Sequence, residues 1–217
     1  MSAPRRGPDR SGGLGHVGAP AQPDSADAAG RADPRRRNLV AAVASIIAAP
    51  GLGGVAGAGL ACLMVAIAVV DAHRFIIPDE FSAAALALGL VDAAIRQLDA
   101  IGAALAGATL RAAVTAGLFF GLWAAYRRLH GRDGIGLGDV KLAGVTGAWL
   151  DWPSIPIAVE IAALAALAVC LVRWLGFGRA ISATTRLPFG LFLAPAIWIA
   201  WLGERMAPQI FSVWGLG

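Results

Sequence analysis

Residues 55–70 read VAGAGLACLMVAIAVV, an uncharged apolar run that stops at Asp71. A helix needs about 20 such residues to cross the ~30 Å hydrocarbon core of a bilayer, and this run supplies most of one transmembrane helix. Other apolar runs occupy residues 39–50, 81–95, 101–126, 140–150, 155–174 and 188–202. None alternates as the strands of a barrel do, and backbone groups in lipid must be hydrogen-bonded within the chain. We therefore predict an all-α, polytopic membrane bundle of six to seven transmembrane helices.

Composition separates the chain into a polar tail and a membrane part. Charged residues make up 15% of the 217 residues and hydrophobic residues 58%, whereas a typical soluble domain is about 25% charged. Residues 1–38 hold almost no large apolar side chain, so we predict a disordered, basic, cytoplasmic tail. Residues 39–205 are then the membrane-embedded domain, and residues 206–217 form a short C-terminal segment.

The distribution of Lys and Arg predicts the orientation of the bundle. If the tail is cytoplasmic and all seven runs cross, most of the 18 Lys and Arg residues fall on the cytoplasmic side, as the positive-inside rule requires. The cluster Arg35-Arg36-Arg37 fits the same rule, although it also resembles the basic region of an export signal. Because such anchors explain the net charge of +4, we predict no nucleic-acid partner.

Few other polar or reactive side chains lie within the apolar runs. Cys62 and Cys170 are predicted to be buried thiols that act as small apolar fillers. No CxxC pair occurs, which excludes a zinc ribbon, and we predict neither a metal nor another cofactor. Arg111 and Glu160 are charged residues within predicted spans, and their opposite signs would allow them to pair.

Two aspartates are predicted to lie at the same membrane face. Asp71 closes one run and Asp139 opens another, and two crossings separate them. Two carboxylates at one half-buried site repel each other, so such a pair holds a single proton over a broad pH range. The ionised group can activate water and the protonated group can protonate a leaving group, as in aspartic proteases. The flanking Gly136 and Gly138 allow unusual backbone conformations and the close approach of a substrate.

Structural roles are the alternatives for these charged residues. Asp139 at the start of a helix suits an N-terminal cap. Asp71 at the end of a helix opposes the helix dipole, so a structural role explains it less well. Lys141 either biases the ionisation of Asp139 or binds a lipid phosphate. Asp79 follows Pro78 in the first turn of a predicted helix, where an acidic side chain suits the helix dipole.

Four ordered motifs resemble the type IV prepilin peptidases, which are GxGD membrane aspartic proteases. Gly136-Leu137-Gly138-Asp139 matches the GxGD motif, and Val140-Lys141-Leu142 fits its continuation. Asp71 followed by Ile77-Pro78-Asp79 looks like the first aspartate motif of that family. Two further stretches match in the same order, Gly147-Ala148-Trp149-Leu150 and Leu187-Pro188-Phe189-Gly190, although Leu191 follows where the family often has proline. The resemblance covers roughly residues 39–205.

The resemblance implies a function and a set of site residues. Asp71 and Asp139 would be the catalytic aspartates, and the supporting motif or substrate residues would be Gly136, Gly138, Lys141, Pro78, Asp79, Pro188, Phe189 and Gly190. The implied reaction removes the short basic leader of prepilin-like precursors (type IV pilins, Flp pilins and pseudopilins of protein secretion) at the cytoplasmic face of the bacterial inner membrane. Bifunctional members carry a four-cysteine insertion and also methylate the new N-terminus. This chain has two cysteines and resembles the short form of Tad/Flp pilus systems, so N-methyltransferase activity is not predicted.

Two functions of other classes compete with this one. A proton-coupled transporter would use the aspartates as a relay and would carry polar side chains along several spans. A non-catalytic component of a membrane assembly would leave precursor processing unchanged when either aspartate is replaced. Under the leading hypothesis the partners are a precursor protein and membrane lipids, and no oligomeric state is predicted.

Overall fold

The computed structural model describes residues 34–49, 51–131, 136–177 and 188–213. Most of the predicted disordered tail, residues 1–33, and the end of the C-terminal segment, residues 214–217, lie outside the described part of the chain. The same holds for Leu187 of the last predicted motif.

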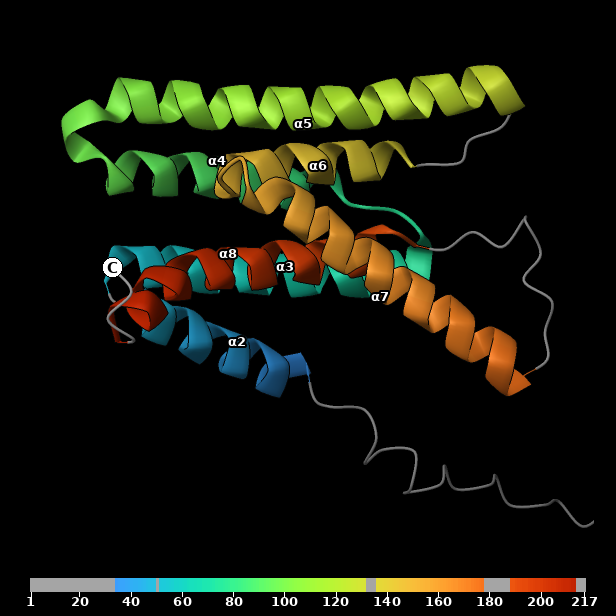
Figure 1. Ribbon diagram of the computed structural model, residues 1–217, viewed down its shortest axis with the longest axis horizontal. Coiled ribbons are helices and arrows are strands. Elements are labelled where there is room, and N and C mark those ends of the chain that lie inside the picture. The colour runs from blue at the N-terminus through green and yellow to red at the C-terminus, as the bar shows by residue number, and fades with distance from the viewer. Residues whose placement is uncertain (1–33, 50, 132–135, 178–187, 214–217) are drawn as a thin grey trace, which may run out of the picture. The chain divides into compact units, whose positions relative to one another are not determined.

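The described residues are helical and contain no strand, which confirms the predicted all-α fold (Figure 1). The elements are α2 (Pro34–Ala48), α3 (Leu52–Arg74), α4 (Asp79–Arg96), the short 3-10 helix η1 (Leu98–Ala100), α5 (Ile101–His130), α6 (Leu137–Trp149), α7 (Ser154–Phe177) and α8 (Gly190–Val213). Three helical stretches in the described part are long and apolar enough to cross a membrane: Leu52–Arg74, Leu98–His130 and Ser154–Leu175. The chain is therefore a membrane protein.

The helix boundaries extend beyond the apolar runs that predict them. α2 begins at Pro34, before the predicted start of the membrane domain at Leu39, so residues 34–38 are helical and do not belong to an irregular tail. α8 continues to Val213, through most of the segment that was predicted to follow the membrane domain. In both cases the helix continues past the end of the apolar run into a segment that contains polar residues.

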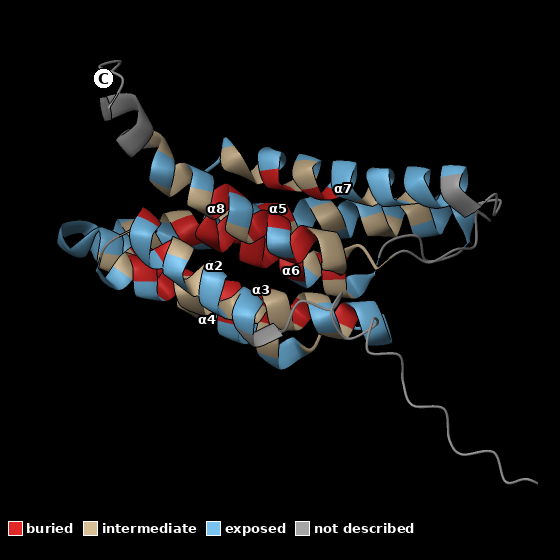
Figure 2. Cartoon of the chain, turned by 90° about the horizontal axis from the view of Figure 1, so that it is seen from below, coloured by how far each residue is buried: buried red, intermediate tan, exposed pale blue. Residues whose placement is uncertain are grey.

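α6 is the most enclosed helix of the bundle. Every residue from Leu142 to Leu150 is buried, and α6 packs against α5, α4 and α8. Figure 2 shows the buried residues concentrated on α6, α8 and α3, whereas most of α7 is exposed. Exposed apolar side chains on α7, such as Leu164 and Leu167, are those expected of a surface that faces lipid.

Two tryptophans fill the core between the helices. A Cβ added to Gly57 would lie 1.9 Å from the Trp201 ring, and one added to Gly89 would lie 2.7 Å from Trp149 Nε1. Glycine at both positions therefore lets α3 and α4 approach the indoles closely. Trp149 Nε1 donates a hydrogen bond of 2.8 Å to the carbonyl oxygen of Ala85 on α4, which satisfies the buried indole.

The cysteine prediction is wrong for this bundle. Cys62 is exposed on α3 and Cys170 is partly exposed on α7, and neither forms a disulfide. A soluble fold would bury such apolar runs inside protein, but a membrane helix can present one face of an apolar run to lipid.

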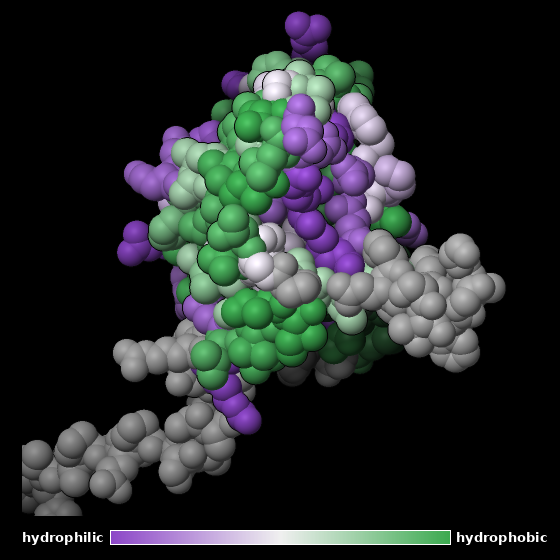
Figure 3. All heavy atoms as spheres, turned by 90° about the vertical axis from the view of Figure 1, so that its left-hand side faces the viewer, coloured by the Kyte–Doolittle hydropathy of each residue, from purple (hydrophilic) through white to green (hydrophobic). Residues whose placement is uncertain are grey.

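The chain direction defines two ends of the bundle. α3 ends, and α4, α6 and α8 begin, at one end, which we call the carboxylate end because Asp71 and Asp139 lie there. α4, α6 and α8 then run toward the opposite end, where α4 passes through η1 into α5 (Figure 1). Figure 3 shows this opposite end, where a band of hydrophilic residues runs beside a hydrophobic part of the surface.

Candidate active site

Asp71 occupies the last turn of α3 and is almost fully buried, with 5% of its surface exposed. A carboxylate at this position opposes the dipole of its own helix, as the sequence indicated. The structure shows what compensates it: the backbone N–H of Leu191, in the first turn of α8, donates a hydrogen bond of 2.9 Å to Asp71 Oδ2. The start of α8 therefore provides the positive end of a second helix dipole to this carboxylate.

Asp139 occupies the first turn of α6 and is 8% exposed. Its Oδ2 accepts a hydrogen bond of 3.3 Å from the N–H of Gly136, and its own N–H donates to the Gly136 carbonyl oxygen at 3.1 Å. The predicted capping role of Asp139 is thus present in the structure. Capping does not exclude chemistry, because the second carboxylate oxygen is not needed for this bond.

The two carboxylates influence each other electrostatically. Asp139 lies outside the three candidate spans, and burial raises the pKa of its carboxyl to about 6. The N–H of Gly136 lowers this pKa, the Asp71 carboxylate raises it, and the N–H of Gly190 lowers it. Consecutive N–H groups at the start of α8, those of Gly190 and Leu191, therefore act on the two aspartates, one on each.

Gly190 provides space that the site requires. A Cβ added there would lie 2.6 Å from Cδ1 of Ile77 and 2.8 Å from Asp71 Oδ2, closer than real Cβ atoms approach. Ile77 is buried, with 6% of its surface exposed, and its side chain also lies against Gly138, where an added Cβ would be 3.0 Å from Ile77 Cβ. Ile77 thus packs between the starts of α6 and α8, although sequence reasoning treated it only as part of a motif.

The unusual backbone conformations predicted for the GxGD glycines are wrong, whereas the close approach of a substrate to them stays a prediction. Gly136 has φ −76° and ψ 144°, which any residue adopts, and a Cβ there would make only an ordinary contact of 3.4 Å with Asp139 Oδ2. Gly138 lies within α6. The close approach at Gly138 comes from Ile77 of the same chain, so the described structure gives this glycine a packing role.

The remaining motif residues shape the helix starts around the carboxylates. Pro78 precedes α4, and its carbonyl oxygen accepts the N–H of Ser82 at 3.3 Å. The carbonyl oxygens of Pro188 and Phe189 accept the N–H groups of Leu191 and Phe192, at 3.2 and 2.9 Å, and so form the first turn that presents Leu191 to Asp71.

Lys141 has a different partner from either one predicted. Its ammonium group forms an ion pair with Asp79, in the first turn of α4, and both side chains are substantially exposed. Lys141 therefore links the starts of α4 and α6. His73 and Glu80 are exposed near the same end of the bundle.

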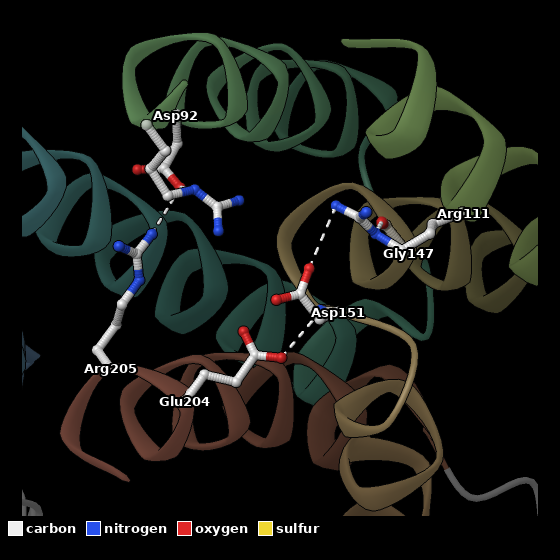
Figure 4. Close-up of polar contacts among 7 residues, drawn as sticks. Asp92, Arg111, Gly147, Asp151, Glu204 and Arg205 are labelled. Carbon is white, nitrogen blue, oxygen red and sulfur yellow. Dashed lines mark hydrogen bonds and ion pairs between the residues drawn. The ribbon is translucent and has the colours of Figure 1, made fainter. Parts of the chain in front are cut away.

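A second group of charged residues lies at the opposite end of the bundle (Figure 4). Asp92 on α4 is fully buried and forms ion pairs with Arg96 at 3.1 Å and with Arg205 of α8 at 3.0 Å. Glu204 of α8 accepts a hydrogen bond of 2.9 Å from the N–H of Asp151. We call this group, completed by Arg111, the charged cluster.

Two sequence expectations fail at the charged cluster. Arg111 does not pair with Glu160, which is exposed on α7; instead it donates to the Gly147 carbonyl oxygen at 3.2 Å and approaches Asp151 Oδ1 at 3.7 Å. Asp92 was not recognised as a charge within a predicted span. The sequence does contain a pattern that indicates its partner, because Asp92 and Arg96 have the i, i+4 spacing of a helical ion pair.

Within the described ranges, no group of three or more His, Cys, Asp or Glu side chains is placed to hold a metal ion. The carboxylate end therefore offers two adjacent carboxyl groups, a set of backbone N–H donors and little exposure to solvent. Two carboxyl groups that share a proton supply both a base and an acid at one place. In aspartic proteases a pair of this kind hydrolyses an amide bond with no covalent intermediate.

Comparison with known proteins identifies the family to which the chain belongs. A sequence model described as the type IV leader peptidase family matches residues 58–171. A prepilin leader peptidase/N-methyltransferase of Aeromonas hydrophila is 30% identical over 168 residues, which cover 76% of this chain and 54% of that protein. Leader peptidase HopD of Escherichia coli is 36% identical over 136 residues, which cover 63% of this chain and 84% of that protein.

The matches to the larger relatives are partial. A prepilin leader peptidase/N-methyltransferase of Burkholderia pseudomallei is 36% identical over 159 residues, or 71% of this chain and 48% of that protein. The chain thus spans about half the length of these prepilin leader peptidase/N-methyltransferases. No solved structure matches significantly. From the family match and the extent of the HopD match, the chain belongs to the type IV leader peptidase family.

Proposed function

We propose that this protein is a membrane aspartic endopeptidase that removes the leader from prepilin-like precursors, with Asp71 and Asp139 as its catalytic pair. The observation that carries the proposal is the pair of nearly buried carboxylates that meet at the starts of α6 and α8. Family membership supports the reaction class, and the printed names of the relatives supply the substrate class.

The mechanism follows from one proton shared by two carboxyl groups. The ionised carboxylate takes a proton from a water molecule as the water oxygen attacks the carbonyl carbon of the scissile bond. The protonated carboxyl then gives its proton to the departing amine nitrogen, and the carbon–nitrogen bond breaks. Each turnover consumes one water and returns the pair to its starting state with one proton. The N–H groups of Gly136 and Leu191 keep both carboxyl groups in position throughout.

The orientation in the membrane is part of the proposal. We place the carboxylate end at the cytoplasmic face of the bacterial inner membrane, with the N-terminus in the cytoplasm. Basic residues support this placement: Arg74 ends α3 at this end, and Arg127 and Arg128 lie in the last turn of α5. At the opposite end, Arg96 and Arg205 are paired with a buried carboxylate and are not comparable membrane anchors.

The partners proposed are a type IV prepilin, Flp prepilin or pseudopilin precursor and the surrounding lipids. This places the protein in type IV pilus assembly or protein secretion. Methylation of the new N-terminus is not part of the proposal.

Co-expression with a candidate prepilin tests this function. The unaltered protein should convert the precursor to a smaller product on a denaturing gel, and Asp71→Asn and Asp139→Asn should each leave it uncut. Asp99→Asn is the matched control, because Asp99 is an exposed aspartate of η1 at the opposite end. All three variants must reach the membrane in equal amounts. Normal processing by either active-site variant would refute the two-aspartate mechanism and favour a non-catalytic role.

A further inference from the structure

Phe75 has an unusual backbone conformation next to the carboxylate site. It is the single non-glycine residue with positive φ in the described part of the chain, with φ 54° and ψ 33°. A bulky L-residue in the left-handed region is uncommon because its Cβ crowds the neighbouring carbonyl oxygen. Such a conformation persists only where something compensates it, and it is concentrated at functional sites.

The chain itself provides a matched comparison. α3 and α5 both end at the carboxylate end, and both end in a left-handed cap whose N–H donates 2.9 Å to the carbonyl oxygen four residues earlier. α5 uses Gly131, the residue that tolerates this conformation without steric cost. α3 uses Phe75 in the same role. The hydrogen-bonded cap therefore does not require a phenylalanine.

Packing inside the protein does not compensate for the phenylalanine. Phe75 is 57% exposed, and its neighbour Ile76 is 64% exposed. Ile77, the next residue, is buried against Gly138 and Gly190. Leu137, which directly precedes Gly138, is 51% exposed. Phe75, Ile76 and Leu137 are therefore exposed apolar residues that are close in sequence to residues packed around the two carboxylates. We call these three residues the apolar rim.

We propose that the apolar rim is a substrate-docking edge that binds an apolar segment of the precursor next to the bond to be cut. This inference rests on the proposed function. The carboxylates are 5% and 8% exposed, so a peptide must approach them past the residues that adjoin them. The rim consists of apolar side chains, so the segment that it binds is apolar as well. The left-handed cap at Phe75 is retained because the ring contributes to substrate binding.

This inference predicts an unusual combination of effects for Phe75→Gly. Removing a strained side chain stabilises the folded protein, so the midpoint of thermal unfolding, followed by tryptophan fluorescence, should rise by roughly 2–4 °C. Removing the ring should raise the KM for precursor cleavage by about tenfold, with kcat nearly unchanged. Ile76→Ser should raise KM similarly. A purely structural phenylalanine predicts the opposite, a lower midpoint with an unaltered KM.

Leu129→Ser is the matched control. Leu129 is 79% exposed in the last turn of α5, at the same end of the bundle but outside the rim. If exposed apolar residues at this end only anchor the protein to lipid, Leu129→Ser and Ile76→Ser should have equal effects. The docking edge requires that Leu129→Ser leave KM unchanged.

A binding experiment separates this inference from the proposed function. A photoreactive benzoylphenylalanine is placed at position 75, or at position 129 as a control, in the Asp139→Asn protein, and a purified prepilin precursor is added. Crosslinking from position 75 alone supports the docking edge. If the unaltered protein cuts the precursor but position 75 does not crosslink and Phe75→Gly leaves KM unchanged, the docking edge is refuted and the peptidase remains. If the unaltered protein cuts no precursor, the proposed function fails, and the docking edge fails with it.

Discussion

The two ends of the bundle bury carboxylates in different ways. At the carboxylate end, Asp71 and Asp139 accept hydrogen bonds from backbone N–H groups at the starts of α8 and α6. At the opposite end, Asp92 is held by two guanidinium groups, those of Arg96 and Arg205. Among the ion pairs of the described residues, none includes Asp71 or Asp139.

The two ends differ in the charge of the groups that face their carboxylates. A guanidinium stays protonated, so at the opposite end the charge of the buried Asp92 carboxylate is offset by two permanent positive charges. At the carboxylate end the partners are neutral backbone N–H groups, which lower the pKa of Asp139 only in part, so burial and the nearby Asp71 carboxylate raise it overall. The pKa of the Asp139 carboxyl is raised to about 6, close to physiological pH.

The largest expected effect comes from replacing an aspartate at the carboxylate end, compared with replacing the buried aspartate at the opposite end. Asp71→Asn or Asp139→Asn should lower kcat for precursor cleavage by at least about 10³-fold, because the shared proton is lost. Asp92→Asn should leave kcat of the folded fraction within a few-fold of the unaltered protein. The measurement is the rate of precursor cleavage by each variant, divided by the amount of folded protein. A comparable loss of kcat in Asp92→Asn would erase the distinction between the two ends.

The next effect concerns the stability that the charged cluster provides. Arg205→Met leaves the buried Asp92 with one of its two guanidinium partners, so the free energy of unfolding should fall by about 3 kcal/mol. The double variant with Asp92→Leu should recover much of this loss, because no unpaired charge then remains buried. Thermal unfolding in detergent measures both. If the double variant instead loses the sum of the stabilities lost in the two single variants, the ion pair between Arg205 and Asp92 does not explain the effect of Arg205→Met.

Gly190→Ala should damage the active site more than the fold. Its Cβ would lie 2.8 Å from Asp71 Oδ2 and 2.6 Å from Ile77 Cδ1, so either the carboxylate or α8 must move. Small displacements of a catalytic group are costly, and we expect kcat to fall by about 10²-fold. Gly203→Ala on the same helix is the control, since nothing lies within 4 Å of its added Cβ. An unaltered kcat in Gly190→Ala would show that the geometry at the start of α8 is not required.

The pH dependence of stability should reveal the raised pKa of Asp139. Asp139 takes up a proton near pH 6 when folded and near pH 3.9 when unfolded. The folded protein binds more protons between these values, so its stability falls as the pH rises through this window, and the full penalty is present above pH 6. Asp139→Asn should therefore raise the thermal midpoint by roughly 5 °C at pH 8 and have little effect at pH 4. An equal shift at both values would contradict the assigned pKa.

Much of this arrangement was predictable from the sequence, and the rest depends on contacts between distant segments. Apolar runs predicted the seven described α-helices, and counting crossings predicted that Asp71 and Asp139 share one end. The hydrogen bond from the Leu191 N–H to Asp71 could not be predicted, because it joins residues far apart in the chain, whose relative position depends on how α3 and α8 pack. The same holds for the pairing of Arg111 with Asp151 in place of Glu160.

The smallest expected effect comes from Ile77→Val, which shortens the side chain that packs between the starts of α6 and α8. The loss of one buried methylene group should lower the free energy of unfolding by about 1 kcal/mol. The double variant Ile77→Val and Gly190→Ala should regain part of the stability lost in Gly190→Ala, because the contact at Ile77 Cδ1 is relieved. It should not regain activity, because the contact with Asp71 remains. Recovery of kcat would show that Ile77, and not Asp71, causes the damage.

The near-complete burial of both carboxylates has a consequence for the membrane around the protein. A hydrolase in a crowded bilayer meets the ends of many unrelated helices at every moment. With 5% and 8% of their surfaces exposed, Asp71 and Asp139 are covered in the resting protein, and chance collisions do not deliver a peptide bond to them. In the proposed peptidase, access to these aspartates is a first point of selectivity that precedes the chemical step. Under the proposed function, bystander proteins would be spared, and a compact inhibitor dissolved in water would reach the aspartates poorly.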